Sequence, residues 1–152
     1  MTSALRELAE SYAALLDATP LEGIATCEVT YMPRIDLVDS DDLQAYVMPV
    51  SRMQTRTSMG TATTCAKETE FKLQVVLYRH NREGDANDLD SADWIADLAE
   101  DIQDMTVGLN IGDNWVIGCE MSAGDGRALD LDEIEQRNSH CAVLEVLFRG
   151  IA

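Results

Sequence analysis

Apolar and polar residues alternate along residues 67–80, and this alternation is the strongest structural signal in the chain. One side carries Phe71, Leu73, Val75 and Leu77, and the other carries Glu68, Glu70, Lys72 and Gln74. Successive side chains of a strand point to opposite faces, so the pattern predicts a strand with one buried and one wet face, as in an antiparallel sheet. Residues 140–149 repeat the pattern, with Ala142, Leu144, Val146 and Phe148 on one side.

Two other segments have their apolar residues at helical spacing. The first covers about residues 3–17, with a stripe of Leu5, Leu8, Tyr12, Leu15 and Leu16, and Pro20 is expected to end it. The second starts near residues 85–90. Its stripe is Trp94, Ile95, Leu98, Ile102, Met105 and Leu109, and Asp93, Asp97, Glu100, Asp101 and Asp104 lie away from that stripe. We expect both stripes to pack on a sheet.

Shorter patterns complete the predicted architecture. Residues 24–31, 43–48 and 115–121 favour strands, Pro49 is expected to end the second of these, and residues 131–137 favour a short helical turn. The polar segment before the alternating strand predicts a hairpin loop at about residues 50–66. The sequence therefore predicts a single α+β domain over residues 1–152. It has an antiparallel or mixed β-sheet of about five strands with a long β-hairpin, packed against two α-helices.

Net charge narrows the classes of partner. The 152 residues include 28 acids against 11 lysines and arginines, a formal net charge of −17. Phosphate contacts need clustered cations, so specific binding to nucleic acid or to an anionic membrane is not expected. The N-terminal segment has early acids and no long apolar run, so neither a signal peptide nor a membrane span is predicted. The four cysteines form no CxxC pair, which indicates reduced, buried thiols in a protein made in the cytoplasm.

No motif with catalytic or metal-binding chemistry is recognisable. Glycine-rich phosphate loops and the GxSxG nucleophile elbow are absent, and His80 and His140 are expected to be exposed at strand ends. The acids Asp36, Asp39, Asp41 and Asp42, like Asp125, Asp130, Asp132 and Glu133, lack the spacing of a calcium-binding loop and are expected to be solvated. We therefore predict no enzyme activity, no metal and no cofactor.

One stretch has the opposite charge balance. No acid occurs from Gln44 through Lys67 in an otherwise acidic chain. We predict that the loop of the hairpin contacts a neighbouring subunit or partner through Arg52, Gln54, Arg56 and Met59. The alternative is a solvated loop without a partner. The acidic side of the second helix leaves the same choice open, between a docking surface and a merely solvated face.

The middle of the chain resembles a phage protein family. Tyr46-Val47-Met48-Pro49 is followed by a Ser/Thr/Arg loop containing Thr55-Arg56 and by the alternating strand Phe71 to Tyr78. An Asp-rich turn, an amphipathic helix and a late strand ending in Phe148-Arg149 come next. Over about residues 22–150 this order is similar to the tail-terminator and head–tail joining (neck) proteins of tailed bacteriophages.

The resemblance implies a structural virion protein without enzyme activity. Members of the family form a ring, commonly a hexamer, at the tail–neck junction. The ring caps the tail tube protein, joins it to a neck or head-completion protein and leaves a lumen for DNA. The protein would then be assembled in the host cytoplasm and reside in the tail or neck of the virion.

Three other functional classes remain compatible with the sequence. The chain could be another neck ring, such as an adaptor, stopper or tail-completion protein. It could be a small-molecule-binding α+β domain, or an enzyme whose site carries no recognisable motif. Mass in solution separates the ring-forming classes from a monomeric binder or enzyme.

Overall fold

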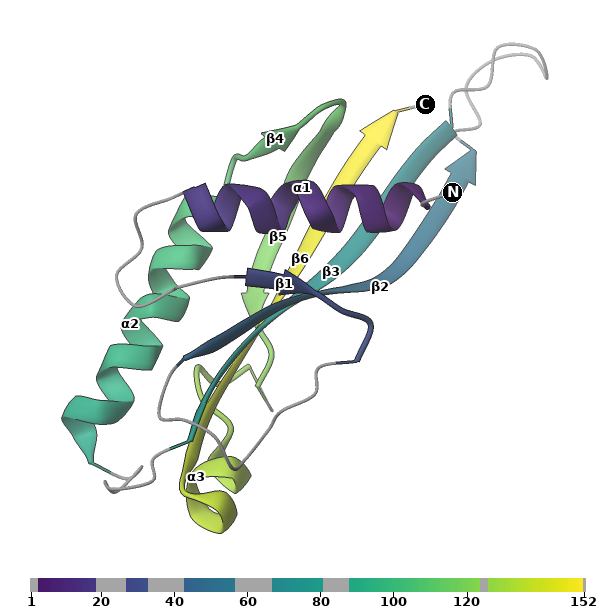
Figure 1. The fold of residues 1–152 in the computed structure, drawn as a ribbon. Coiled ribbons are helices and arrows are strands. Elements are labelled where there is room, and N and C mark those ends of the chain that lie inside the picture. The colour runs from purple at the N-terminus through teal and green to yellow at the C-terminus, as the bar shows by residue number, and fades with distance from the viewer. Residues whose placement is uncertain are drawn as a thin grey trace.

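The computed structural model describes residues 3–18, 27–32, 43–56, 67–80, 88–123 and 126–151. These residues form three helices and six strands (Figure 1). The elements are α1 (Ala4–Ala18), β1 (Cys27–Val29), β2 (Gln44–Arg56), β3 (Lys67–His80), α2 (Leu89–Thr106), β4 (Asn110–Ile111), β5 (Asn114–Met121), α3 (Leu131–Arg137) and β6 (Ser139–Ile151). The predicted α+β class is confirmed.

The strands form one mixed sheet in the order β1-β2-β3-β6-β5-β4. β1 pairs with β2 in parallel, and all the other neighbours are antiparallel. The described sheet has six strands rather than about five, because β4 and β5 form a small hairpin through Gly112. Gly112 adopts a positive φ of 59°, which glycine tolerates better than other residues. A two-residue strand such as β4 is too short to produce a visible alternation in the sequence.

α1 and α2 cover the same face of the sheet (Figure 1). α1 packs on β1 and β2, and α2 packs on β5 and β6. The buried side of the sheet is the one predicted from the alternation, and its apolar side chains join those of both helices in one core. Its sheet members include Phe71, Leu73, Val75, Leu77, Ala142, Leu144, Val146 and Phe148. We call this the core face and the opposite side the open face.

Tyr12 connects both helices to the sheet. Its hydroxyl lies 2.6 Å from Thr106 Oγ1 of α2, and that oxygen donates to the carbonyl of Ile102 at 2.6 Å. Thr106 has only one hydroxyl proton, so Tyr12 is the donor in their shared bond. The Tyr12 ring also meets Phe148 of β6 edge to face, with ring centroids 5.8 Å apart. Burial raises the pKa of Tyr12 well above its usual range.

The two predicted helical stripes agree with the structure except at single positions. Leu8, Tyr12 and Leu16 are buried as expected, while Leu15 is 36% exposed and the small residues Ala9 and Ala13 face the core instead. The predicted helical turn at residues 131–137 is α3.

The acids around α3 have a structural role. The Asp130 carboxylate caps the helix, accepting from the backbone N–H groups of Asp132 at 2.9 Å and Glu133 at 3.4 Å. Carboxylates are favourable at this position because the first N–H groups of a helix lack partners.

Strand β2 continues past Pro49, where the sequence predicted its end. The carbonyl of Val47 accepts from Thr30 N at 3.1 Å, so the backbone groups of Val47 point toward β1 and away from β3. Pro49 lies two residues further along and has the same orientation. Its missing N–H therefore removes no hydrogen bond to β3. A bulge between Pro49 and Ser51 follows, and the strand then runs to Arg56.

His140 is fully buried, so the prediction of an exposed strand-end histidine is wrong. It lies on the core face of β6, two residues before Ala142. Its neighbour across the strands, Arg79, stacks on the ring of Trp94 in α2 at 4.9 Å. The start of α2 therefore covers this end of the sheet. The side chain of His80 lies outside the described residues.

Leu98→Ala tests the packing of α2. Leu98 is 3% exposed within the core, so truncation is expected to lower the unfolding free energy by about 2–5 kcal/mol. Leu89→Ala on the same helix is the control, because Leu89 is 76% exposed and its loss is expected to cost little. Urea unfolding measures both. Equal losses for the two variants would show that the core does not use this side of α2.

Tyr12→Phe and Thr106→Val should differ in cost. Tyr12→Phe leaves Thr106 Oγ1 still bonded to Ile102, so a loss of about 0.5–1.5 kcal/mol is expected. Thr106→Val buries the Tyr12 hydroxyl without that partner, and the expected loss is about 1–3 kcal/mol. Thermal unfolding of both variants at equal concentration gives the order. A greater loss for Tyr12→Phe would contradict this hydrogen-bond assignment.

Candidate functional site

Residues 50–54, in the last part of β2, are the longest run of exposed residues in the described strands. We call Val50–Arg56 the β2 extension. β1 pairs with β2 only at residues 45–47, so the outer edge of the extension has no neighbouring strand among the described residues (Figure 1). Val50 is 44% exposed and Met53 57% exposed. The extension contains no acid, in contrast to the rest of the chain.

The structure places the predicted contact residues differently from the sequence. The predicted loop at about 50–66 begins later, because Arg52, Gln54 and Arg56 all belong to strand β2. Arg52 and Gln54 are exposed, opposite Phe71 and Thr69 of β3. The backbone of Arg56 pairs with Lys67, but its side chain lies outside the described residues. Met59 lies outside them altogether.

Arg52 extends along the rim of the core face. Its guanidinium carbon lies 5.9 Å from the centroid of the Phe71 ring, at the outer limit of a cation–π contact. Pro49, the bulge after it and the charge of Arg52 are features by which edge strands avoid unwanted pairing. This edge is therefore better suited to contacts through side chains than to accepting another strand.

The open face beside the extension carries a mixed row of side chains. Register places Met53, Glu70, Arg149 and Trp115 next to one another on β2, β3, β6 and β5. Arg149 pairs with Glu70 at 2.7 Å, and that hydrogen bond raises the pKa of Arg149. On the same face, Lys72 Nζ of β3 and Glu145 Oε1 of β6 lie 3.2 Å apart and form a second ion pair. These cations are thus already neutralised within the chain.

Two exposed apolar residues on this sheet were not predicted. Trp115 is 36% exposed and Ile117 is 40% exposed. Strict alternation would place both on one side with Cys119, but a bulge between Val116 and Gly118 shifts the register. Trp115 therefore lies on the open face, whereas Cys119 is buried. Gly118 was the available signal, since a glycine within a strand often marks a bulge.

Reactive thiols, metal-ligand clusters and membrane-spanning helices are not found among the described residues. Burial raises the pKa of Cys27 and Cys141 to about 12 and that of Cys119 to about 11, so these thiols stay protonated at neutral pH. Cys65 lies outside the described residues. No group of three or more His, Cys, Asp or Glu side chains in the described part could hold a metal ion. Within the same segments, no helix is long and apolar enough to cross a membrane.

The acidic side of α2 is exposed as the sequence predicted. Its members Asp93, Asp97, Glu100, Asp101 and Asp104 all face solvent. Like charges on one helix side repel one another, so water and counter-ions are the ordinary environment of such a surface. Exposure alone does not distinguish a docking surface from a solvated one.

Comparisons with known proteins give a structural likeness only. No protein-family model matches the sequence, and no curated protein matches it. Among solved structures, the fold is similar to a chain of the "Virion of native gene transfer agent (GTA) particle", with a TM-score of 0.50 and 15% sequence identity. The match covers 99% of this chain and 100% of the other. At this identity, the likeness establishes a shared fold over the whole length.

Proposed function

We propose that this chain is a structural protein of a virion, and more specifically a tail terminator. In this proposal several copies, most simply six, form a ring at the tail–neck junction. The ring caps the tail tube, joins it to a neck or head-completion protein and leaves a lumen through which DNA passes. The protein has no catalytic role.

The fold likeness carries this proposal. A chain of a gene transfer agent virion shares the fold over 99% of this chain, without large additions on either side. The order of strand, Pro49, paired strand and amphipathic helix is also the order on which the resemblance to tail terminators depends.

Charge is compatible with a passage for DNA. With a net charge of −17 per copy, a ring would repel the phosphate backbone rather than bind it. A conduit needs this property because bound DNA would not slide through.

A neck ring of another kind and a small-molecule-binding domain are the alternatives. Another neck ring would share the assembly behaviour and differ in its partners. A binding domain would be monomeric. Sedimentation velocity, together with negative-stain images of the purified protein alone and mixed with tail tubes, tests the proposal. Closed rings that sit at tube ends are the expected result, and a strict monomer under all conditions would reject it.

Charge reversal in the β2 extension should block assembly. Arg52→Glu combined with Arg56→Glu reverses two cations per copy in a region without acids. Arg52 is exposed, and both residues belong to the β2 extension, which β1 does not cover. We expect the double variant to lose ring formation in negative-stain images. Its urea unfolding should stay within about 1 kcal/mol of the native chain, because exposed pairs contribute only about 0.2–1 kcal/mol each. Normal rings from this variant would exclude the extension from the interface.

Salt should promote self-association. Six copies carry a charge on the order of −100, and the repulsion acts over about 10 Å at 0.1 M salt. At about 1 M salt this length falls to roughly 3 Å, so copies should associate more strongly. A sedimentation series across salt concentrations measures the direction. Rings that dissociate as salt rises would show that ion pairs between copies outweigh the net repulsion.

A further inference from the structure

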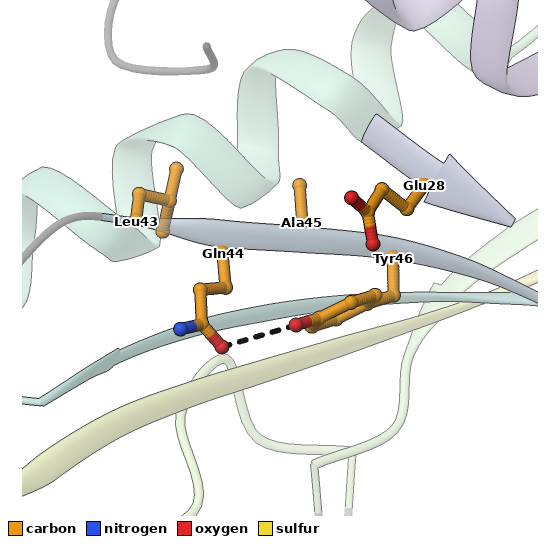
Figure 2. Close-up of a pocket in the computed structure, with 5 residues that line it drawn as sticks. All are labelled: Glu28, Leu43, Gln44, Ala45 and Tyr46. Atoms are coloured by element: carbon orange, nitrogen blue, oxygen red, sulfur yellow. Dashed lines mark hydrogen bonds between the residues drawn. The ribbon is translucent and has the colours of Figure 1, made fainter. Parts of the chain in front are cut away.

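Two adjoining hollows lie where β1 meets β2. Among the described residues, the first is lined by Glu28, Leu43, Gln44, Ala45 and Tyr46 and has a volume of about 230 Å³ (Figure 2). The second has about 190 Å³ and is lined by Glu28, Thr30, Met32 and Tyr46. Each is smaller than the roughly 300–1,000 Å³ of typical small-molecule sites. Each hollow alone has room for one side chain.

Glu28 and Tyr46 belong to both hollows. They are direct neighbours in the parallel register of β1 and β2, so their side chains share one face of the sheet. Figure 2 shows Tyr46 turned toward Gln44, where its hydroxyl donates to Oε1 at 3.1 Å. This bond holds the ring in place. Burial, followed by the charge of Glu28, raises the pKa of Tyr46, so the phenol stays neutral beside the carboxylate.

The lining is suited to a cationic side chain. Glu28 is exposed and forms no ion pair with any described residue. A guanidinium can pair with a carboxylate and lie on an aromatic ring at the same time, which a small inorganic cation cannot do as well. The position of β1 is itself fixed, since Cys27 N donates to the Asp17 carboxylate at 2.7 Å and Thr30 N to the Val47 carbonyl. These hydrogen bonds fix the backbone of β1 on both sides of Glu28.

Arg52 and Arg127 are exposed arginines without a carboxylate partner among the described residues, and Arg52 matches this lining because of its place on β2. Most described cations already have partners: Arg6 pairs with Glu10, Lys72 with Glu145, and Arg149 with Glu70. Arg52 is exposed, contacts the Phe71 ring and has no carboxylate partner among the described residues. It also lies on the strand edge that β1 leaves uncovered.

Arg52 and the hollows cannot meet within one molecule. Tyr46 and Arg52 are six residues apart on β2, or about 20 Å. They also point to opposite faces, because Arg52 is registered with Phe71 on the core face and Tyr46 with Val76 on the open face. Two different surfaces that complement each other between copies form a head-to-tail contact. Repetition of such a contact closes into a ring or continues as a filament.

We propose that the hollow at Glu28 and Tyr46 receives the guanidinium of Arg52 from a second copy of this chain. This inference rests on the proposed ring, since it names the contact that joins neighbouring copies. Glu28 supplies the counter-charge, the Tyr46 ring supports the guanidinium plane, and Gln44 orients that ring.

A charge swap tests the contact. Glu28→Arg and Arg52→Glu, each alone, should lower the association constant between copies by at least about tenfold, because each places like charges together. The double variant Glu28→Arg with Arg52→Glu restores an opposite pair and should return to within about threefold of the native value. Sedimentation velocity at one salt concentration measures all four proteins. Far-UV circular dichroism checks that each is folded.

Matched controls separate the contact from net charge. Glu120→Arg changes the charge as much as Glu28→Arg, and Arg127→Glu as much as Arg52→Glu, at exposed positions outside the hollows. Glu28→Arg makes the chain less acidic, so general repulsion alone would strengthen association. Weaker association of Glu28→Arg than of Glu120→Arg therefore supports a specific contact. Likewise, Arg52→Glu should associate less strongly than Arg127→Glu.

The other outcomes are equally distinct. If the native chain forms rings and the single reversals associate like their controls, the contact is overturned and the proposed function stands. If Glu28→Arg weakens association but the swap does not restore it, the occupant is another cation and the assignment to Arg52 is overturned. If the native chain never associates at any salt concentration or with tail tubes, both proposals fall.

Discussion

Burial of one face of β3 and β6 under α1 and α2 is the constraint on which the other features of the molecule depend. The two strands are the centre of the sheet, and their core-face side chains between Phe71 and Leu77 and between Ala142 and Phe148 are almost fully buried. Tyr12 of α1 links the two helices to the sheet, because it contacts Thr106 of α2 and Phe148 of β6. With α1 and α2 on one side, the exposed part of the other side, away from the buried Val76 and Tyr78, must be stable in contact with water. The ion pairs from Glu70 to Arg149 and from Lys72 to Glu145 meet that requirement.

The same constraint locates the surfaces that are free to contact other proteins. α1 and α2 occupy the core face, and Val76 and Tyr78 are buried at one end of the open face, so the rest of the open face and the two sheet edges are left. One edge ends in the two-residue strand β4, and the other in the three-residue strand β1. Short edge strands limit unwanted pairing between sheets. Because β1 has only three residues, it pairs with only part of β2. The β2 extension and the Glu28 hollow both lie where this short pairing ends.

Periodicity predicted the parts of the fold that regular burial controls. The bounds of β3 and α3, the core sides of β3 and β6 and the exposed acids of α2 all follow from alternation or helical spacing. Prolines and bulges that interrupt the regular alternation of a strand were not predicted. Pro49 does not end β2 because its missing N–H faces away from β3, which local sequence does not show, and the bulge at Ile117 places Trp115 on the open face.

The candidate site was predictable only in part. The acid-free stretch pointed to Arg52, which is exposed, but the residue lies on strand β2 rather than in the predicted loop, and its contact with a partner stays a prediction. The hollow depends on a parallel pairing that brings Glu28 beside Tyr46 across a long connection, and no local pattern signals such a pairing. The signal in the sequence was therefore a charge balance, and the carboxylate that we propose as its partner could be located only from the sheet order.

Charge decides how strongly any assembly of this chain can hold. One exposed ion pair contributes about 0.2–1 kcal/mol, which is little against the mutual repulsion of copies that each carry −17. Such a pair therefore cannot drive association by itself. Its effect is on orientation: one cation facing one carboxylate beside an aromatic ring favours a single arrangement of neighbours, and wrong arrangements place acid against acid. Exposed apolar residues on the open face, such as Met53 and Trp115, are then the groups that can supply attraction, because burying them gains free energy at any salt concentration. In the proposed contact, specificity from Arg52 and attraction from apolar area would thus be separate properties of the same sheet.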